Sequence, residues 1–298
     1  MNMDREEIIA KVQRLTGIFT DDVTTLCQDW LDHIQDDITR RYDFPFLTGF
    51  TEIATTPTYE TGTIDVTNAS TAITGTGTSF ASTMVGSYLK ASGSAEYYQI
   101  ASVESTTELT LTTNYLGDTD TALEYAIHKL FYDLPADFGK MKWAKQMVSA
   151  RRLVPIPDFV FTDIVPNEFD SSGEVSGYIL SGQSSAGRQQ IRFYPLQTSS
   201  KLIYISYKKK LSTINTEGAE SVIPSDWHQA FVFKLAEYVY EANDLDFKAN
   251  KMAAIFEVEM AKMIKENKEM LRDMSYQMKE EDLGYATEKP RLPDDYEY

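Results

Sequence analysis

Hydrophobic and polar residues follow two different periods along this chain. Near the N-terminus, apolar residues recur every three or four positions, which predicts two consecutive amphipathic helices. Asp4 and Thr20 are placed to cap these helices, and Gly17 is placed to end the first one. Within residues 58–129, apolar residues alternate with Thr and Ser, while Gly, Asn and Asp separate the runs. This stretch is therefore predicted to be a small antiparallel β domain.

The alternating pattern returns in the second half of the chain. An aromatic run at residues 42–50 is expected to fill the junction between helices and β structure. After the inserted β domain, a short helix is expected at residues 137–145. Period-two alternation then runs through residues 159–211 and predicts a second β region. Its expected strands cover residues 159–161, 177–180, 190–194 and 201–207.

The last part of the chain is helical in pattern again. Ser225 is expected to cap one helix, and a longer helix follows residues 243–244. The longer helix carries methionines at helical spacing, for which two interpretations stand: a buried core, or a face that packs on several neighbours in an assembly. These methionines are Met252, Met260, Met263, Met270, Met274 and Met278. Residues 280–298 are acidic and aperiodic, so they are expected to form an extended arm.

These patterns together predict an α+β fold class. The expected architecture is a helical bundle formed by the N- and C-terminal ends, with antiparallel β regions inserted between them and an extended C-terminal arm. The predicted divisions are a helical body at 1–57 and 222–279, an inserted Thr/Gly-rich β domain at 58–129, a second β region with a short helix at 130–221, and the arm at 280–298.

Charge and composition narrow the functional classes. The chain has 298 residues and a net charge of −17, which makes it poorly suited to grip nucleic acid, although an acidic wall can surround DNA and let it slide. The single cysteine, Cys27, excludes an internal disulfide; it lies on an apolar stripe and is interpreted as a buried hydrophobic residue rather than a nucleophile. Without an apolar membrane span or a signal peptide, the protein is expected to be made in the cytoplasm.

Enzyme chemistry has little support in the sequence. His33, His128 and His228 lie far apart and fit no metal-binding or catalytic motif. His33 has helical spacing to Asp29 and Asp37 that suits a metal, but such a cluster is more often a solvated helix face. We therefore predict no enzyme activity, no catalytic residues, no cofactor and no metal.

Basic residues gather in two places despite the acidic balance. Two interpretations of these basic groups have about equal support. They are either solvated strand and helix faces, or contacts to the acidic face of a neighbouring subunit or to DNA passing through a ring. The candidate interface or DNA-facing residues are Lys140, Lys142, Lys145, Arg151 and Arg152 in one group, and Lys208, Lys209 and Lys210 in the other.

Several sequence fragments follow one another in an order that carries a resemblance. They are Phe44-Pro45-Phe46, the Thr/Gly-rich insertion with Gly75-Thr76-Gly77 and Tyr97-Tyr98-Gln99-Ile100, the run Tyr132-Asp133-Leu134-Pro135-Ala136-Asp137-Phe138, and Ile223-Pro224-Ser225-Asp226-Trp227 before the helical pair. Together they resemble the head-to-tail adaptor proteins of tailed bacteriophages, the connectors that sit below the portal.

The resemblance implies a structural virion protein of the neck, between capsid and tail. Such proteins form a dodecameric ring around the DNA ejection channel, so the implied partners are further copies of the chain, the portal protein, tail or nozzle proteins, fibres, and double-stranded DNA contacted without sequence specificity. Portal docking is assigned to the end of the long helix and the arm. The assigned residues are Tyr276, Leu283, Tyr285, Tyr296 and Tyr298.

Two other functional classes compete with this interpretation. The first is a phage fibre or decoration protein whose β domain binds carbohydrate through aromatics such as Tyr97 and Tyr98, although alternation predicts that one of the two is buried. The second is a tail-associated glycan hydrolase, which requires a carboxylate pair that only folding brings together.

Overall fold

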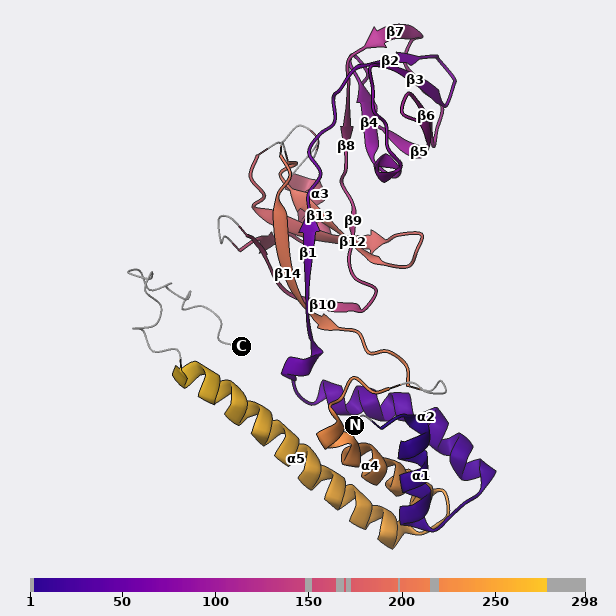
Figure 1. The fold of residues 1–298 in the computed structure, drawn as a ribbon, viewed down its shortest axis with the longest axis vertical. Helices are drawn as coiled ribbons and strands as arrows, with labels where there is room; N and C mark the ends of the chain where they lie inside the picture. The colour runs from indigo at the N-terminus through magenta and orange to yellow at the C-terminus, as the bar shows by residue number, and fades with distance from the viewer. Residues whose placement is uncertain are drawn as a thin grey trace. The chain divides into compact units, whose positions relative to one another are not determined.

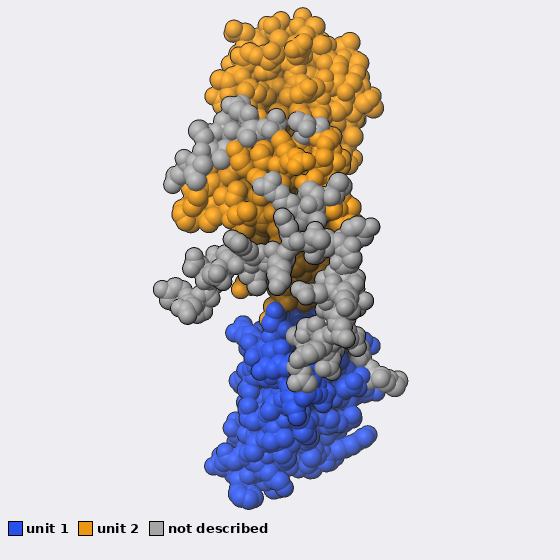
Figure 2. Space-filling model, turned by 90° about the vertical axis from the view of Figure 1, so that its left-hand side faces the viewer, with its two compact units in different colours: residues 1–47, 211–298 blue, residues 48–210 orange. Residues whose placement is uncertain are grey.

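The chain folds into two compact units. The computed structural model describes residues 3–147, 152–164, 169, 173–197, 199–214 and 220–277, with only the backbone described at 163, 164 and 270–277. Unit 1 comprises Met1–Leu47 and Leu211–Tyr298, and unit 2 comprises Thr48–Lys210 (Figures 1 and 2). Unit 1 is thus assembled from two separate stretches of the chain, whereas unit 2 is continuous. The predicted arm lies outside the described residues.

The N-terminal helices of unit 1 begin at the residues that the sequence predicts. Helix α1 (Arg5–Thr16) is capped by Asp4, whose Oδ1 accepts a hydrogen bond from the Glu7 amide at 2.8 Å. Gly17 ends it with a left-handed φ of 74°. Helix α2 (Asp21–Arg40) is capped by Thr20, whose hydroxyl accepts from the Val23 amide. These three predictions are confirmed.

The C-terminal helices of unit 1 are α4 (His228–Glu241) and α5 (Asp246–Gln277), preceded by the 3-10 turn η4 (Ser225–Trp227). No side chain caps α4 or η4, so the prediction that Ser225 caps a helix was wrong: Ser225 lies inside the 3-10 turn rather than before it. Met260 and Met263 are buried in the core of this unit, which confirms the core interpretation for these two methionines. No helix in the described ranges combines the length and apolarity needed to cross a bilayer.

Seven strands of unit 2 form one curled antiparallel sheet with the order β7-β2-β3-β6-β5-β4-β8 (Figure 1). Alternate residues of these strands, such as Ile64 and Val66, or Leu109 and Leu111, point into its own core. The strands are β2 (Thr63–Val66), β3 (Ala72–Thr76), β4 (Tyr88–Ala91), β5 (Tyr98–Ser105), β6 (Glu108–Leu111), β7 (Asp120–Leu123) and β8 (Tyr125–His128).

Two further sheets share a second core in unit 2. One has the order β1-β14-β10, and the other has the order β11-β12-β13-β9, with the short helix α3 (Asp158–Ile164) beside it. Ile53, Ile203 and Ile191 are among the buried residues that join them. The strands are β1 (Thr48–Ala54), β9 (Tyr132–Asp133), β10 (Phe138–Gln146), β11 (Val154–Pro155), β12 (Gly177–Gln183), β13 (Gln189–Tyr194) and β14 (Leu202–Lys209).

The predicted fold class was wrong. The chain is mostly antiparallel β sheet, including the curled seven-stranded sheet, and its few helices lie mostly toward the C-terminus. Residues 137–145 were expected as a helix, but 138–145 belong to strand β10 and Asp137 lies in the turn before it, because pairing along β14 outweighs their weak local preference. Residues 159–161, expected as a strand, belong to α3, because three alternating residues are too few to define a period.

Candidate functional site

The three-stranded sheet β1-β14-β10 has one buried face and one outward face. Ile53 pairs with Ile203, and both side chains are buried in the core. Because successive residues of a strand point to opposite faces, the neighbouring positions of these strands point outward. Phe50 is one of them, and 63% of its surface is exposed. One exposed aromatic residue does not define a site, so the side chains beside Phe50 decide whether this face is a candidate for contact with another molecule.

Two aromatic rings lie over the central strand of that face. Phe50 on β1 and Trp143 on β10 both pair with Ser206 on β14, so they lie on either side of it. Their ring centroids are 6.2 Å apart, and Ser206 is only 1% exposed. The two rings therefore cover the middle of the sheet and present an apolar centre to the outside.

Lysines surround this apolar centre. Lys140 on β10 pairs directly with Lys208 on β14. Lys142 extends its Nζ to the hydroxyl of Thr48 on β1 at 3.0 Å, and Lys145 holds its Nζ 5.7 Å from the Trp143 ring centroid. We call this surface the aromatic–lysine face and define it as Phe50, Trp143, Tyr204, Lys140, Lys142, Lys145 and Lys208.

The aromatic–lysine face is mainly positive, whereas the chain as a whole is negative. Like charges directly opposite each other on paired strands, such as Lys140 and Lys208, destabilise a sheet. One carboxylate, Glu52, also lies on the face; its hydrogen bond and charge raise the pKa of Tyr204. In a chain with a net charge of −17, a lysine-ringed aromatic surface is complementary to acidic surfaces like those elsewhere on the same protein.

The structure brings the two predicted basic groups together. Lys140, Lys142 and Lys145 from one group share the sheet face with Lys208 from the other, because β10 and β14 pair along their lengths. Arg152 pairs with Lys145 through an isolated bridge on the other side of β10. Lys209 pairs with Phe138 near the strand end, and the amide of Lys210 bonds the carbonyl of Asp137. Arg151 lies outside the described residues.

Sequence reasoning missed the aromatic centre of this face. Phe50 was expected to fill a junction between helices and β structure, but it is exposed, and this expectation was wrong for Phe50. Trp143 lay in the segment expected to be helical. The useful pattern was the alternation of Thr48, Phe50 and Glu52, which places Phe50 on the side of the polar residues.

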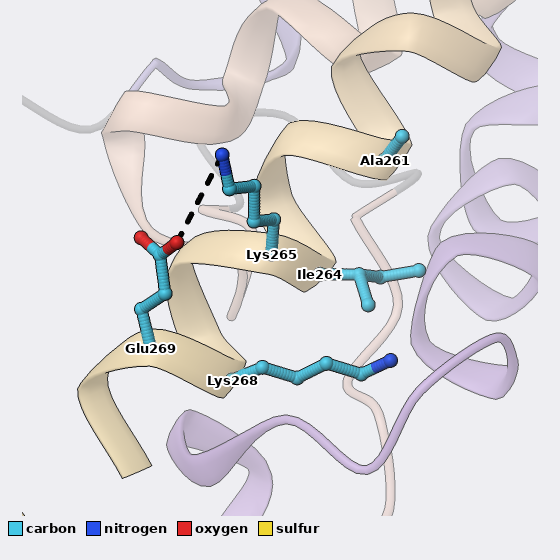
Figure 3. A pocket seen from close by; sticks show the side chains of 5 residues that line it. All are labelled: Ala261, Ile264, Lys265, Lys268 and Glu269. Carbon is cyan, nitrogen blue, oxygen red and sulfur yellow. Dashed lines mark ion pairs between the residues drawn. The ribbon is translucent and has the colours of Figure 1, made fainter. Parts of the chain in front are cut away.

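A second surface feature lies on helix α5 in unit 1. A hollow of about 480 Å³ is lined by Ala261, Ile264, Lys265, Lys268 and Glu269 (Figure 3). Lys265 and Glu269 form an ion pair of 3.8 Å on one side, while Ile264 and Lys268 point to the other (Figure 3). Tyr276, assigned to portal docking, belongs to the last turns of α5; Leu283, Tyr285, Tyr296 and Tyr298 lie outside the described residues.

The histidines and the cysteine are placed separately. His33 is exposed on α2, His128 ends β8, and His228 is buried at the start of α4. Among the residues that the structure describes, no three His, Cys, Asp or Glu side chains lie close enough to hold a metal ion. Cys27 is fully buried, which confirms its interpretation as a core residue, and burial raises the pKa of its thiol to about 12.

Comparison with known proteins gives no family for this chain: no family model matches it, and no curated protein matches it.

Proposed function

We propose that this chain is a structural protein of a tailed-bacteriophage virion, a ring-forming head-to-tail adaptor that docks on the portal and connects it to the tail around the DNA channel. The order of its sequence fragments supports this proposal through the resemblance to phage adaptors. The observation that carries the assembly role is the aromatic–lysine face. Exposed Phe50 and half-buried Trp143 form an apolar centre of the residue type that is enriched at protein interfaces, and the lysines around it supply charge complementary to an acidic partner.

Charge favours a protein partner for this face over DNA. DNA binding gains its free energy from the release of counterions by clustered cations, and its strength falls with the net negative charge of the protein around the cluster. The chain carries 45 acidic and 28 basic residues, so its long-range field repels phosphates. A DNA channel with such walls lets the duplex pass without holding it, which suits a connector.

The test is native mass spectrometry of the dilute purified protein, alone and mixed with the portal protein of the same phage. We expect a monomer alone and a full ring on the portal, with recruitment lost when residues 280–298 are deleted. The matched control is the four-residue change Lys262→Glu, Lys265→Glu, Glu259→Lys and Glu269→Lys, which exchanges charges on exposed α5 without removing any segment. A monomer that ignores the portal overturns the proposal.

A stable free trimer in the same experiment supports the competing class, a fibre or decoration protein with a carbohydrate-binding β domain. The aromatic pair suggested for that role is divided by the sheet: Tyr98 is 3% exposed, and its hydroxyl accepts from the Leu116 amide, while Tyr97 stays partly accessible. A glycan array probed with the full chain then distinguishes the two classes, because a carbohydrate-binding protein is expected to bind a glycan and an adaptor is not.

A further inference from the structure

Two connections of the chain, the α1–α2 loop and the α4–α5 turn, lie at one end of unit 1. Helices α1 and α4 run parallel and side by side (Figure 1). At their starts, the Met3 amide donates to His228 Nδ1 at 3.0 Å; at their ends, the Tyr240 hydroxyl donates to the Leu15 carbonyl at 3.3 Å. The α4–α5 turn then folds back, with the Leu245 amide donating to the Tyr240 carbonyl. The α1–α2 loop and the α4–α5 turn therefore lie at the same end of unit 1.

That end exposes large apolar side chains. Phe19 in the α1–α2 loop is 68% exposed, and Phe247 at the start of α5 is 86% exposed. Leu15 and Leu245 beside them are each exposed by more than a third. We call these four residues the apolar end. Single exposed apolar residues need no explanation, but a group from two turns held together by Tyr240 marks an interaction surface.

Five exposed carboxylates flank the apolar end in the sequence. Two open α2, one ends α4, one lies in the α4–α5 turn and one begins α5: Asp21, Asp22, Glu241, Asp244 and Asp246. Two exposed basic residues lie close to them in the sequence, Arg14 in the last turn of α1 and Lys248 in the first turn of α5. The rim is therefore negative, which disfavours an anionic lipid surface as the occupant.

We propose that the apolar end of one copy of this chain packs on the aromatic–lysine face of the next copy. The two surfaces are complementary in two respects: each has exposed phenylalanine at its centre, and the charge of the acidic rim is opposite to that of the lysines on the face. Because the two surfaces differ and each copy carries both, the contact is head-to-tail, and it generates a ring when the rotation between copies closes. This inference rests on the proposed ring-forming function and names the contact that forms the ring.

The test uses charge reversal on each surface of the full chain. A face variant carries Lys140→Glu and Lys208→Glu, and an end variant carries Asp22→Lys and Glu241→Lys. The wild type is expected to self-associate with rising concentration in sedimentation equilibrium, and each variant is expected to weaken that association at least tenfold. A mixture of the two variants is expected to regain association in alternating order. The native end of the face variant fits the native face of the end variant, and the two altered surfaces, whose charges are exchanged, also attract each other.

A chain with all four substitutions is expected to recover self-association, because both charges of the contact are exchanged. The control is Lys262→Glu with Lys265→Glu on exposed α5, which is expected to associate like the wild type. Three results overturn the contact: variants that associate like the wild type, a mixture that does not associate, or a wild type that stays monomeric throughout the concentration series.

Failure of this contact and failure of the adaptor function give different results. If both variants still form rings on the portal, the contact is wrong and the adaptor function stands. If the wild type self-associates through the two surfaces but ignores the portal, the contact stands and the adaptor function is wrong.

Discussion

Replacing His228 with Leu should destabilise unit 1 selectively. His228 is 0% exposed and uses both ring nitrogens: Nδ1 accepts from the Met3 amide at 3.0 Å, and Nε2 donates to the Ile223 carbonyl at 2.7 Å. Leucine fills a similar volume but leaves that amide and that carbonyl without partners. Each unsatisfied buried group costs about 1–3 kcal/mol, so we expect a loss of about 3 kcal/mol in the free energy of unfolding. For a unit of this size the melting temperature should fall by about 10 °C.

The stabilising effect of His228 should also depend on pH. Burial lowers the pKa of His228 below its ordinary value of 6.5. In the folded protein the ring stays neutral, while in the unfolded chain it takes up a proton as the pH falls below about 6.5. The contribution of His228 is therefore fully present above that pH and is lost progressively as the pH falls toward the lower folded pKa. The stability difference between wild type and variant should shrink in the same range.

The assay follows tryptophan fluorescence during thermal unfolding in a Trp143→Phe background. Trp30 and Trp227, both in unit 1, then remain as the reporters. His33→Leu, at an exposed position of the same unit, is the control and should change stability by less than about 0.5 kcal/mol. A His228→Leu variant that melts like the wild type at pH 7.5, or a difference that widens on acidification, would refute the reasoning.

Two further predictions concern close packing. Gly49→Ala should destabilise unit 2 by about 1–3 kcal/mol, because a Cβ there overlaps the ring of Tyr207 on the paired strand. The control is Gly182→Ala, where the space around the added Cβ is open, and equal denaturant midpoints for the two variants would contradict the prediction. Cys27 should resist iodoacetamide at pH 8 in the native protein and react in denaturant, because burial raises its pKa to about 12; equal rates in both conditions, followed by mass spectrometry, would contradict this.

Local signals in the sequence predicted the local structure well. Helix caps depend on a side chain and an amide three residues apart, so Asp4 and Thr20 could be assigned without knowing the rest of the fold. Cys27 could be placed in the core because it shares a stripe with apolar neighbours on one helix. In each case the physical cause acts within one or two turns of the chain.

The candidate site could not be predicted because it depends on distant pairing. Lys140 and Lys208 meet only because β10 pairs with β14. Alternation tells which residues share a face of one strand, but it does not tell which strands lie next to each other. The same limit contributes to the error in fold class: residues 137–145 were expected to form a short helix, but the pairing of β10 with β14 joins them to β1 in one sheet.

The division of unit 1 between two stretches of the chain sets the order in which the protein can fold during synthesis. Helices α1 and α2 leave the ribosome first, but α4 and α5, which cover their apolar stripes, follow only after all of Thr48–Lys210. All of unit 2 is synthesised before α4 and α5, so it can reach its native structure while α1 and α2 still lack the helices that cover them. Nascent chains should therefore pass through a stage in which one unit is folded and the apolar stripe of α2 is open to chaperones or to a neighbouring nascent copy.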